Sequence, residues 1–161
     1  MSHHIQGIVF RRTLLSAAKR LIPGGRDAAL PQGFCFIPIT DRVFDELRSA
    51  HPPGLVDPEN GFERLSAPVE IVAKALSGPE PVAYVETEYF GGDGGQAAIV
   101  WKGGQVVLSA KSPDAGPINN ALAFLGVQRQ EHHDEFDAVG LGDYRSNSAW
   151  FHKAPEAKEA S

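Results

Sequence analysis

Apolar residues spaced three and four positions apart predict four helices in this chain, over residues 14–22, 41–50, 67–76 and 117–125. Glycine or proline follows each predicted helix within two residues, and both residue types end helices. Thr40 and Ser66 stand before two of the helices, where a hydroxyl can accept a hydrogen bond from a backbone N–H of the first turn. The apolar spacing and the end signals therefore indicate the same four segments.

Shorter apolar and aromatic runs predict five strands, over residues 5–10, 33–39, 82–90, 96–101 and 105–110. The last three are consecutive, so they form an antiparallel meander. Gly103-Gly104 is the two-residue turn between the second and third of these, and residues 91–95 are a longer glycine-rich loop between the first and second. The pattern predicts an α+β fold: an antiparallel sheet built around this C-terminal-half β-meander, with about four helices packed mainly on one face.

The chain length indicates one core. A chain of 161 residues folded as one domain buries roughly 70% of the surface that its unfolded form exposes, whereas two cores would each be marginal. We expect a single α+β domain over residues 1–152. Residues 153–161 are small and charged, and we expect them to be a frayed C-terminal tail.

Composition narrows the class of partner. The formal net charge is −5, and lysine and arginine are scattered, so the basic footprint that nucleic-acid binding needs is missing. No apolar run approaches the ~18 residues of a membrane span. Cys35 is the single cysteine, and a lone cysteine builds no disulfide framework. We expect a cytoplasmic protein that binds neither nucleic acid nor membrane and has no cofactor.

The glycine-rich loop invites a nucleotide-binding interpretation. Gly92-Asp93-Gly94-Gly95-Gln96-Ala97 matches the formal pattern G-x-G-x-x-A. That motif requires a helix directly behind the loop to receive the pyrophosphate, and here a strand follows, so we reject it. Two interpretations stay open: a hairpin tip in which glycine supplies positive φ, or a binding loop that lets a partner approach the backbone.

Glu86 and Glu88 are two residues apart in a predicted strand, so their carboxylates lie about 7 Å apart on one face of the sheet. Tyr84 and Phe90 share this face. Paired carboxylates can divide acid and base roles, bind a metal, or receive an arginine from a partner. They can equally be the solvated end of a strand. Asp93 adds a third nearby acid, which favours protein recognition.

Two later segments carry further polar groups. His132, His133 and Asp134 are potential metal ligands, but adjacent histidines point in different directions, and a charged surface stretch is the simpler interpretation. Residues 141–147 are polar and contain glycine, so this segment is a candidate second recognition loop.

The favoured function is a small non-catalytic protein-binding domain of bacterial type. Its most concrete form is an immunity-type inhibitor that neutralises a toxin by contact through an acidic sheet face and the glycine-rich hairpin. We expect another protein with a basic surface as the partner, and a homo-oligomer is a further possibility. The predicted contact residues are Glu86, Glu88, Tyr89, Phe90, Gly92, Asp93, Gly94, Gln96, Asp143, Tyr144 and Arg145. The alternative is an enzyme, or a small-ligand or metal-binding domain, that uses the Glu86 and Glu88 carboxylates.

Overall fold

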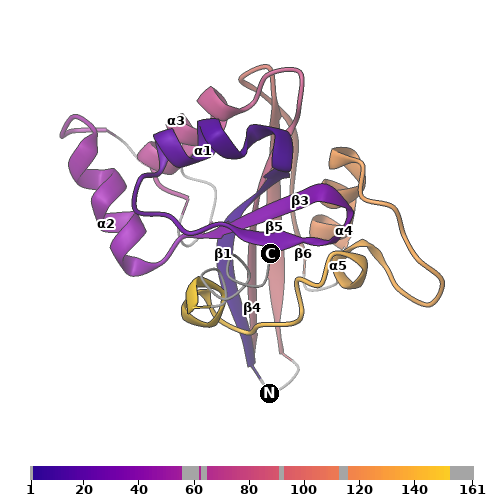
Figure 1. Ribbon diagram of the computed structural model, residues 1–161. Helices are drawn as coiled ribbons and strands as arrows, with labels where there is room; N and C mark the ends of the chain where they lie inside the picture. Colours follow the sequence, from indigo (N-terminus) through magenta and orange to yellow (C-terminus); the bar gives the residue numbers. More distant parts are fainter. Residues whose placement is uncertain (1, 56–61, 63–64, 91–92, 113–115, 153–161) are drawn as a thin grey trace.

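Six strands form one antiparallel sheet in the computed structural model, which describes residues 2–55, 62, 65–90, 93–112 and 116–152 (Figure 1). The strands are β1 (Ser2–Arg11), β2 (Ala28–Leu30), β3 (Phe34–Pro38), β4 (Val82–Phe90), β5 (Asp93–Lys102) and β6 (Gln105–Ser112). Their spatial order is β2-β3-β1-β4-β5-β6. The first strand of the chain therefore lies in the middle of the sheet, between β3 and β4.

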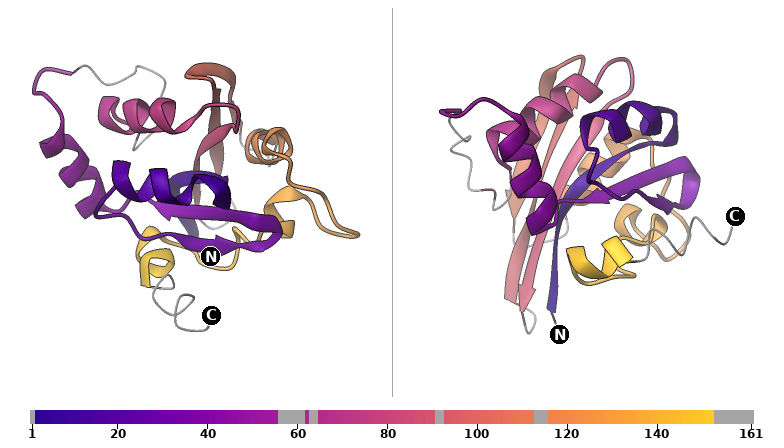
Figure 2. Two further views of the ribbon diagram at one scale, coloured as in Figure 1. Left: turned by 45° about the horizontal axis from the view of Figure 1, so that its top comes forward. Right: turned by 60° about the vertical axis from the view of Figure 1, so that its left-hand side comes forward.

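Three helices cover one face of this sheet. They are α1 (Leu15–Leu21), α2 (Asp41–Ala50) and α3 (Ala67–Leu76). Thr40 and Ser66 cap α2 and α3, each accepting a hydrogen bond from the backbone N–H three residues later. The helices bury their apolar sides against Ile8, Phe10 and Tyr84 of the central strands. Figures 1 and 2 show these helices gathered on one side of the sheet.

The opposite face is covered by the C-terminal third of the chain. It contains α4 (Gly116–Leu125), α5 (Glu135–Ala138) and a short helix over residues 147–152. Ile118 and Leu122 of α4 pack with Trp150 against Val9 and Val85 of the sheet. The sheet thus lies between two layers, each with its own buried apolar cluster.

The α+β fold and its antiparallel sheet are confirmed, and so is the meander of β4, β5 and β6. Gly103 and Gly104 have positive φ in the second turn, as that turn requires. Three of the four predicted helices share one face, whereas α4 packs on the other face together with residues between 127 and 152. Apolar spacing predicts a helix but not the face that it covers, and the irregular residues carry too weak a pattern to predict their position. Across the described residues, no helix has the length and apolar character to cross a membrane.

The first turn of the meander is tighter than predicted. Phe90 is paired with Asp93, so Gly94 and Gly95 belong to β5 instead of a loop. Gly94 has a φ of 143°, and a Cβ there would collide with the carbonyl oxygen of Glu88 on the neighbouring strand. The close contact between two strands thus explains at least this glycine.

Candidate functional site

Two of the predicted contact residues, Glu88 and Arg145, lie on opposite sides of the N-terminal half of β1. On one side, His4 is paired with Glu88 of β4. On the other side, its backbone N–H donates to the carbonyl oxygen of Arg145 over 2.8 Å. Glu88 and Arg145, which belong to two candidate recognition segments far apart in sequence, therefore flank the same strand. We call Glu88, Phe90 and His4 the open end of the sheet.

Glu86 and Glu88 share a face of β4, as predicted, but their surroundings differ. Glu86 is 8% exposed, and its Oε2 accepts a hydrogen bond of 2.5 Å from the Tyr84 hydroxyl. Glu88 is exposed. Glu86 therefore forms part of the buried structure, and only Glu88 can meet a partner at the surface.

The aromatic residues after Glu88 differ in the same way. Phe90 is 56% exposed and contacts the His4 ring edge to face, with 5.9 Å between ring centroids. Tyr89 lies on the other face, half-buried, where its hydroxyl accepts from the Gln96 side-chain amide. The same amide group of Gln96 accepts from the backbone N–H of Ile118, so it joins β5 to the start of α4. Gln96 and Tyr89 thus hold layers together, while Phe90 projects outward.

Two further predicted contact residues belong to the turn between β4 and the start of β5. Gly92 lies outside the described residues. Asp93 is described as the first residue of β5, without its side chain.

The segment 143–145 is divided between surface and core. Asp143 and Arg145 are exposed, whereas Tyr144 is half-buried and packs against Trp150, with ring centroids 4.8 Å apart. The carbonyl oxygen of Tyr144 accepts from the Trp150 indole N–H. Tyr144 therefore anchors this segment to the core, while Asp143 and Arg145 are exposed to solvent.

The histidine-rich segment does not converge on a metal site. His132 and His133 are exposed, while the Asp134 carboxylate caps α5 and accepts from the Asn119 side chain over 2.9 Å. Burial raises the pKa of Asp134, but hydrogen bonds from the Asp137 backbone N–H and from Asn119 outweigh it and leave the pKa below its usual value. Among the described residues, no three His, Cys, Asp or Glu side chains are grouped to hold a metal ion.

His3 is a structural residue that the sequence did not reveal. The Thr87 hydroxyl lies 2.6 Å from its Nδ1, and the carbonyl oxygen of Leu141 lies 3.2 Å from its Nε2. Thr87 also accepts from the backbone N–H of Ile5, so its own hydrogen is directed to His3. This arrangement fits a neutral ring with the hydrogen on Nε2, and burial lowers the pKa of His3 below its usual value.

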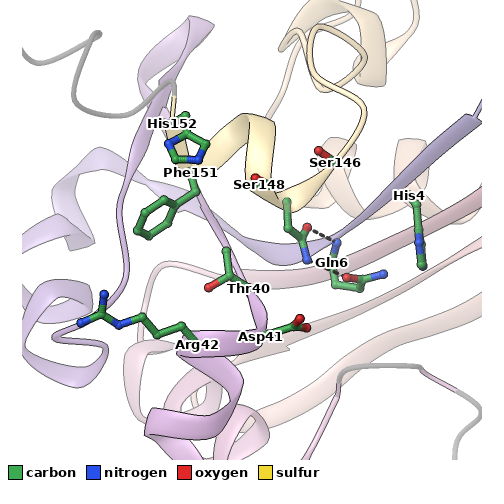
Figure 3. A pocket seen from close by; sticks show the side chains of 10 residues that line it. His4, Gln6, Thr40, Asp41, Arg42, Ser146, Ser148, Phe151 and His152 are labelled. Atoms are coloured by element: carbon green, nitrogen blue, oxygen red, sulfur yellow. Dashed lines mark hydrogen bonds between the residues drawn. The ribbon is translucent and has the colours of Figure 1, made fainter.

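A cavity of about 450 Å³ adjoins the open end of the sheet. Its wall comes from β1, the start of α2 and the helix over residues 147–152 (Figure 3). His4, Gln6, Thr40, Asp41 and Asn147 are among its lining residues. Sequence reasoning did not find it, because segments at the two ends of the chain build it together.

The chain matches no protein-family model, no curated protein and no solved structure. Any functional assignment therefore depends on the residues of this chain alone.

Proposed function

We propose that the protein is a non-catalytic binding domain that contacts another protein through the open end of its sheet. The proposal depends mainly on the exposure of Phe90: this large aromatic side chain is 56% exposed, beside the exposed carboxylate of Glu88. Aromatic side chains, phenylalanine included, are enriched in protein interfaces relative to the rest of the surface. In its most concrete form, the protein is a cytoplasmic, immunity-type inhibitor of a bacterial toxin.

Phe90 differs from the apolar residues that the fold uses. Tyr84 on the same face of β4 is fully buried under the helices, whereas Phe90 is six residues further along, at the end of the strand. Both are aromatic, so hydrophobicity alone does not separate them. Exposing an aromatic ring has a cost in water, and contact with a partner would remove that cost.

Charge supports a basic partner. The formal net charge is −5, and Glu88 places one carboxylate directly beside Phe90. Asp143 and Arg145 lie across β1 from Glu88, in the segment bonded to His4. An acidic surface attracts a basic partner over several ångströms and speeds association, while the aromatic anchor slows dissociation.

Affinity capture from a native cell extract tests the proposal. The bait is the full chain, compared with the double variant Glu88→Arg/Phe90→Ala. A matched control is Glu131→Arg/Val106→Ala, which makes the same kinds of change at exposed positions elsewhere. We expect one basic protein to be retained by the unaltered chain and the control, and lost by the double variant.

Equal capture by all three baits would reject the open end as the contact surface. Capture of no specific protein would favour the second candidate, an enzyme or ligand-binding domain. The observation that favours this candidate is the Glu86 carboxylate, buried and bonded to the Tyr84 hydroxyl. If this second candidate is right, Glu86→Gln should abolish binding of the ligand, whereas Glu88→Gln should retain it.

A further inference from the structure

The cavity beside the open end is large enough for a small molecule. Its volume of about 450 Å³ lies within the range of roughly 300–1,000 Å³ that is typical of small-ligand sites. Of the three residues at the open end, His4 also lines this cavity, whereas Glu88 and Phe90, which carry the proposed protein contact, do not. A function for the cavity is therefore a separate question.

Gln6 supplies an unpaired donor in the cavity wall. Its side chain is 3% exposed, and its Oε1 accepts from the Asn147 side-chain amide over 2.6 Å. Its Nε2 is buried and has no hydrogen-bond partner. Figure 3 shows this amide nitrogen turned toward His4, away from the dashed bond. A buried donor without an acceptor is uncommon in a folded protein and calls for an explanation.

The orientation of the Gln6 amide is fixed by its neighbour. Asn147 Oδ1 accepts from the Gln6 backbone N–H over 2.8 Å, and Asn147 Nδ2 donates to the carbonyl oxygen of Ile39 over 3.0 Å. These backbone partners determine which end of the Asn147 amide is nitrogen. That nitrogen must face Gln6 Oε1, so exchanging the two ends of the Gln6 amide would place two donors against each other.

Other donors line the same cavity. The Thr40 hydroxyl oxygen accepts from the backbone N–H of Val43, and the Ser146 hydroxyl oxygen accepts from that of Ala149. Each hydroxyl keeps its own hydrogen to donate. Thr40 also stands at the N-terminus of α2, where the helix dipole favours negative charge.

The charged and polar side chains that line the cavity indicate which chemical class of ligand it suits. Arg42 and His152 contribute nitrogen donors, and Asp41 is the one carboxylate among the described lining residues. Phe151 adds an aromatic surface from the helix over residues 147–152. Donors outnumber acceptors, so the cavity suits a ligand rich in acceptors, with an apolar body and few negative charges.

We propose that this cavity binds a small organic monocarboxylate. One carboxylate oxygen accepts from Gln6 Nε2, and the Thr40 and Ser146 hydroxyls donate to the group as well. The apolar body of the ligand lies toward Phe151. Asp41 disfavours a second carboxylate. The inference does not depend on the proposed protein partner, because it uses different residues and a different ligand.

Titration with sodium benzoate, followed by NMR on the ¹⁵N-labelled full chain, tests the site. The side-chain NH₂ signal of Gln6 reports directly on the atom concerned. We expect saturable shifts of this signal and of the Thr40 and Ser146 backbone signals. Gln6→Glu keeps the size of the side chain but replaces the donor by a negative charge, and should weaken binding by about tenfold or more. Gln105→Glu makes the same change at an exposed position of β6 and should bind as the unaltered chain does.

Three results would overturn the assignment. The first is no saturable shift up to about 20 mM benzoate, far above the concentration that even a weak site requires. The second is equal binding of benzamide, the uncharged analogue, because the carboxylate would then be irrelevant. The third is tighter binding of N-acetylglutamate methylamide than of benzoate, which would assign the carboxylate to a protein side chain. The dispersion of the backbone signals shows whether Gln6→Glu is folded, and Ser146→Ala provides a second variant if it is not.

Discussion

The two ends of β4 have the same alternation of side chains but different surroundings. From Val82 to Val85, the side chains on both faces are buried in the two apolar clusters. From Glu88 to Phe90, the side chains on the face of α1–α3 are exposed. We call the first the covered end and the second, with His4, the open end.

This contrast teaches that strand periodicity gives the face of a residue but not its burial. Glu86 and Glu88 point the same way, yet one is bonded beneath the surface and the other is displayed. The layer above the sheet decides between these outcomes, and that layer comes from distant parts of the chain. Variants at matched positions of the two ends can test this difference.

The largest expected effect is at the covered end. Trp101 is fully buried in β5, and Trp101→Ala removes a large core side chain, so we expect a loss of about 3–5 kcal/mol in unfolding free energy. Phe90→Ala, at the open end, should change it by less than about 0.5 kcal/mol. Urea unfolding followed by circular dichroism measures both. Similar losses for the two variants would mean that Phe90 belongs to the core.

The glycine in the hairpin should give the next largest effect. A Cβ at Gly94 would strike the Glu88 carbonyl oxygen, so Gly94→Ala should cost roughly 3 kcal/mol through strain and separation of the strands. Gly104 also has positive φ but open space around it, and Gly104→Ala should cost roughly 1 kcal/mol. Thermal unfolding of the two variants ranks them. A tolerated Gly94→Ala would favour a binding role for this glycine over a structural one.

Substitution of the two glutamates of β4 should change the unfolding free energy by smaller amounts than the glycine substitutions do. Glu86→Ala leaves the buried Tyr84 hydroxyl without this acceptor, and we expect a loss of about 1–3 kcal/mol. Glu88→Ala should cost less than about 0.5 kcal/mol, since its side chain is exposed. Denaturant unfolding of both variants provides the comparison. Equal stability of the two would contradict a structural role for Glu86.

The smallest expected effect is a pH dependence at His3. Burial lowers the pKa of His3 in the folded protein below the usual value of 6.5. At a pH between the folded pKa and 6.5, the unfolded chain therefore binds a proton more readily than the folded protein does. Stability should therefore fall as the pH drops below about 6.5, down to the folded pKa. Denaturant unfolding at several pH values from about 7.5 to about 5.5, on both sides of the usual histidine pKa, measures this dependence.

His3→Gln should flatten this part of the pH profile, because glutamine does not titrate. His132→Gln is the matched control, since it makes the same substitution at an exposed position. An unchanged slope in His3→Gln would assign the pH dependence to another group.

Much of the fold could be predicted because its signals are local. Alternating residues in β4 and β5, and the paired glycines at 103 and 104, were enough to predict the meander. The sequence predicted Ser66 as the cap of α3 and either Thr40 or Asp41 as the cap of α2, and the structure has Ser66 and Thr40 in these places. The place of β1 in the middle of the sheet could not be predicted, because strand order depends on pairing between distant segments.

The candidate site was less accessible to sequence reasoning for the same reason. Pairing of β1 with β4, and the bond from His4 to Arg145, join three distant segments. Gln6 and Asn147 stand 141 residues apart, and neither carries a motif. The spacing of Glu86 and Glu88 predicted a shared face correctly, but their different burial required the complete set of layers.

Hydrogen–deuterium exchange of the full chain, with and without the captured partner, shows whether the open end of the sheet is the contact surface. We expect slower exchange in the partner complex over residues 87–90 and in the neighbouring segment 144–146, with little change in β6. Protection confined to β6 or to the exposed side of α2, with no change at the open end, would contradict it.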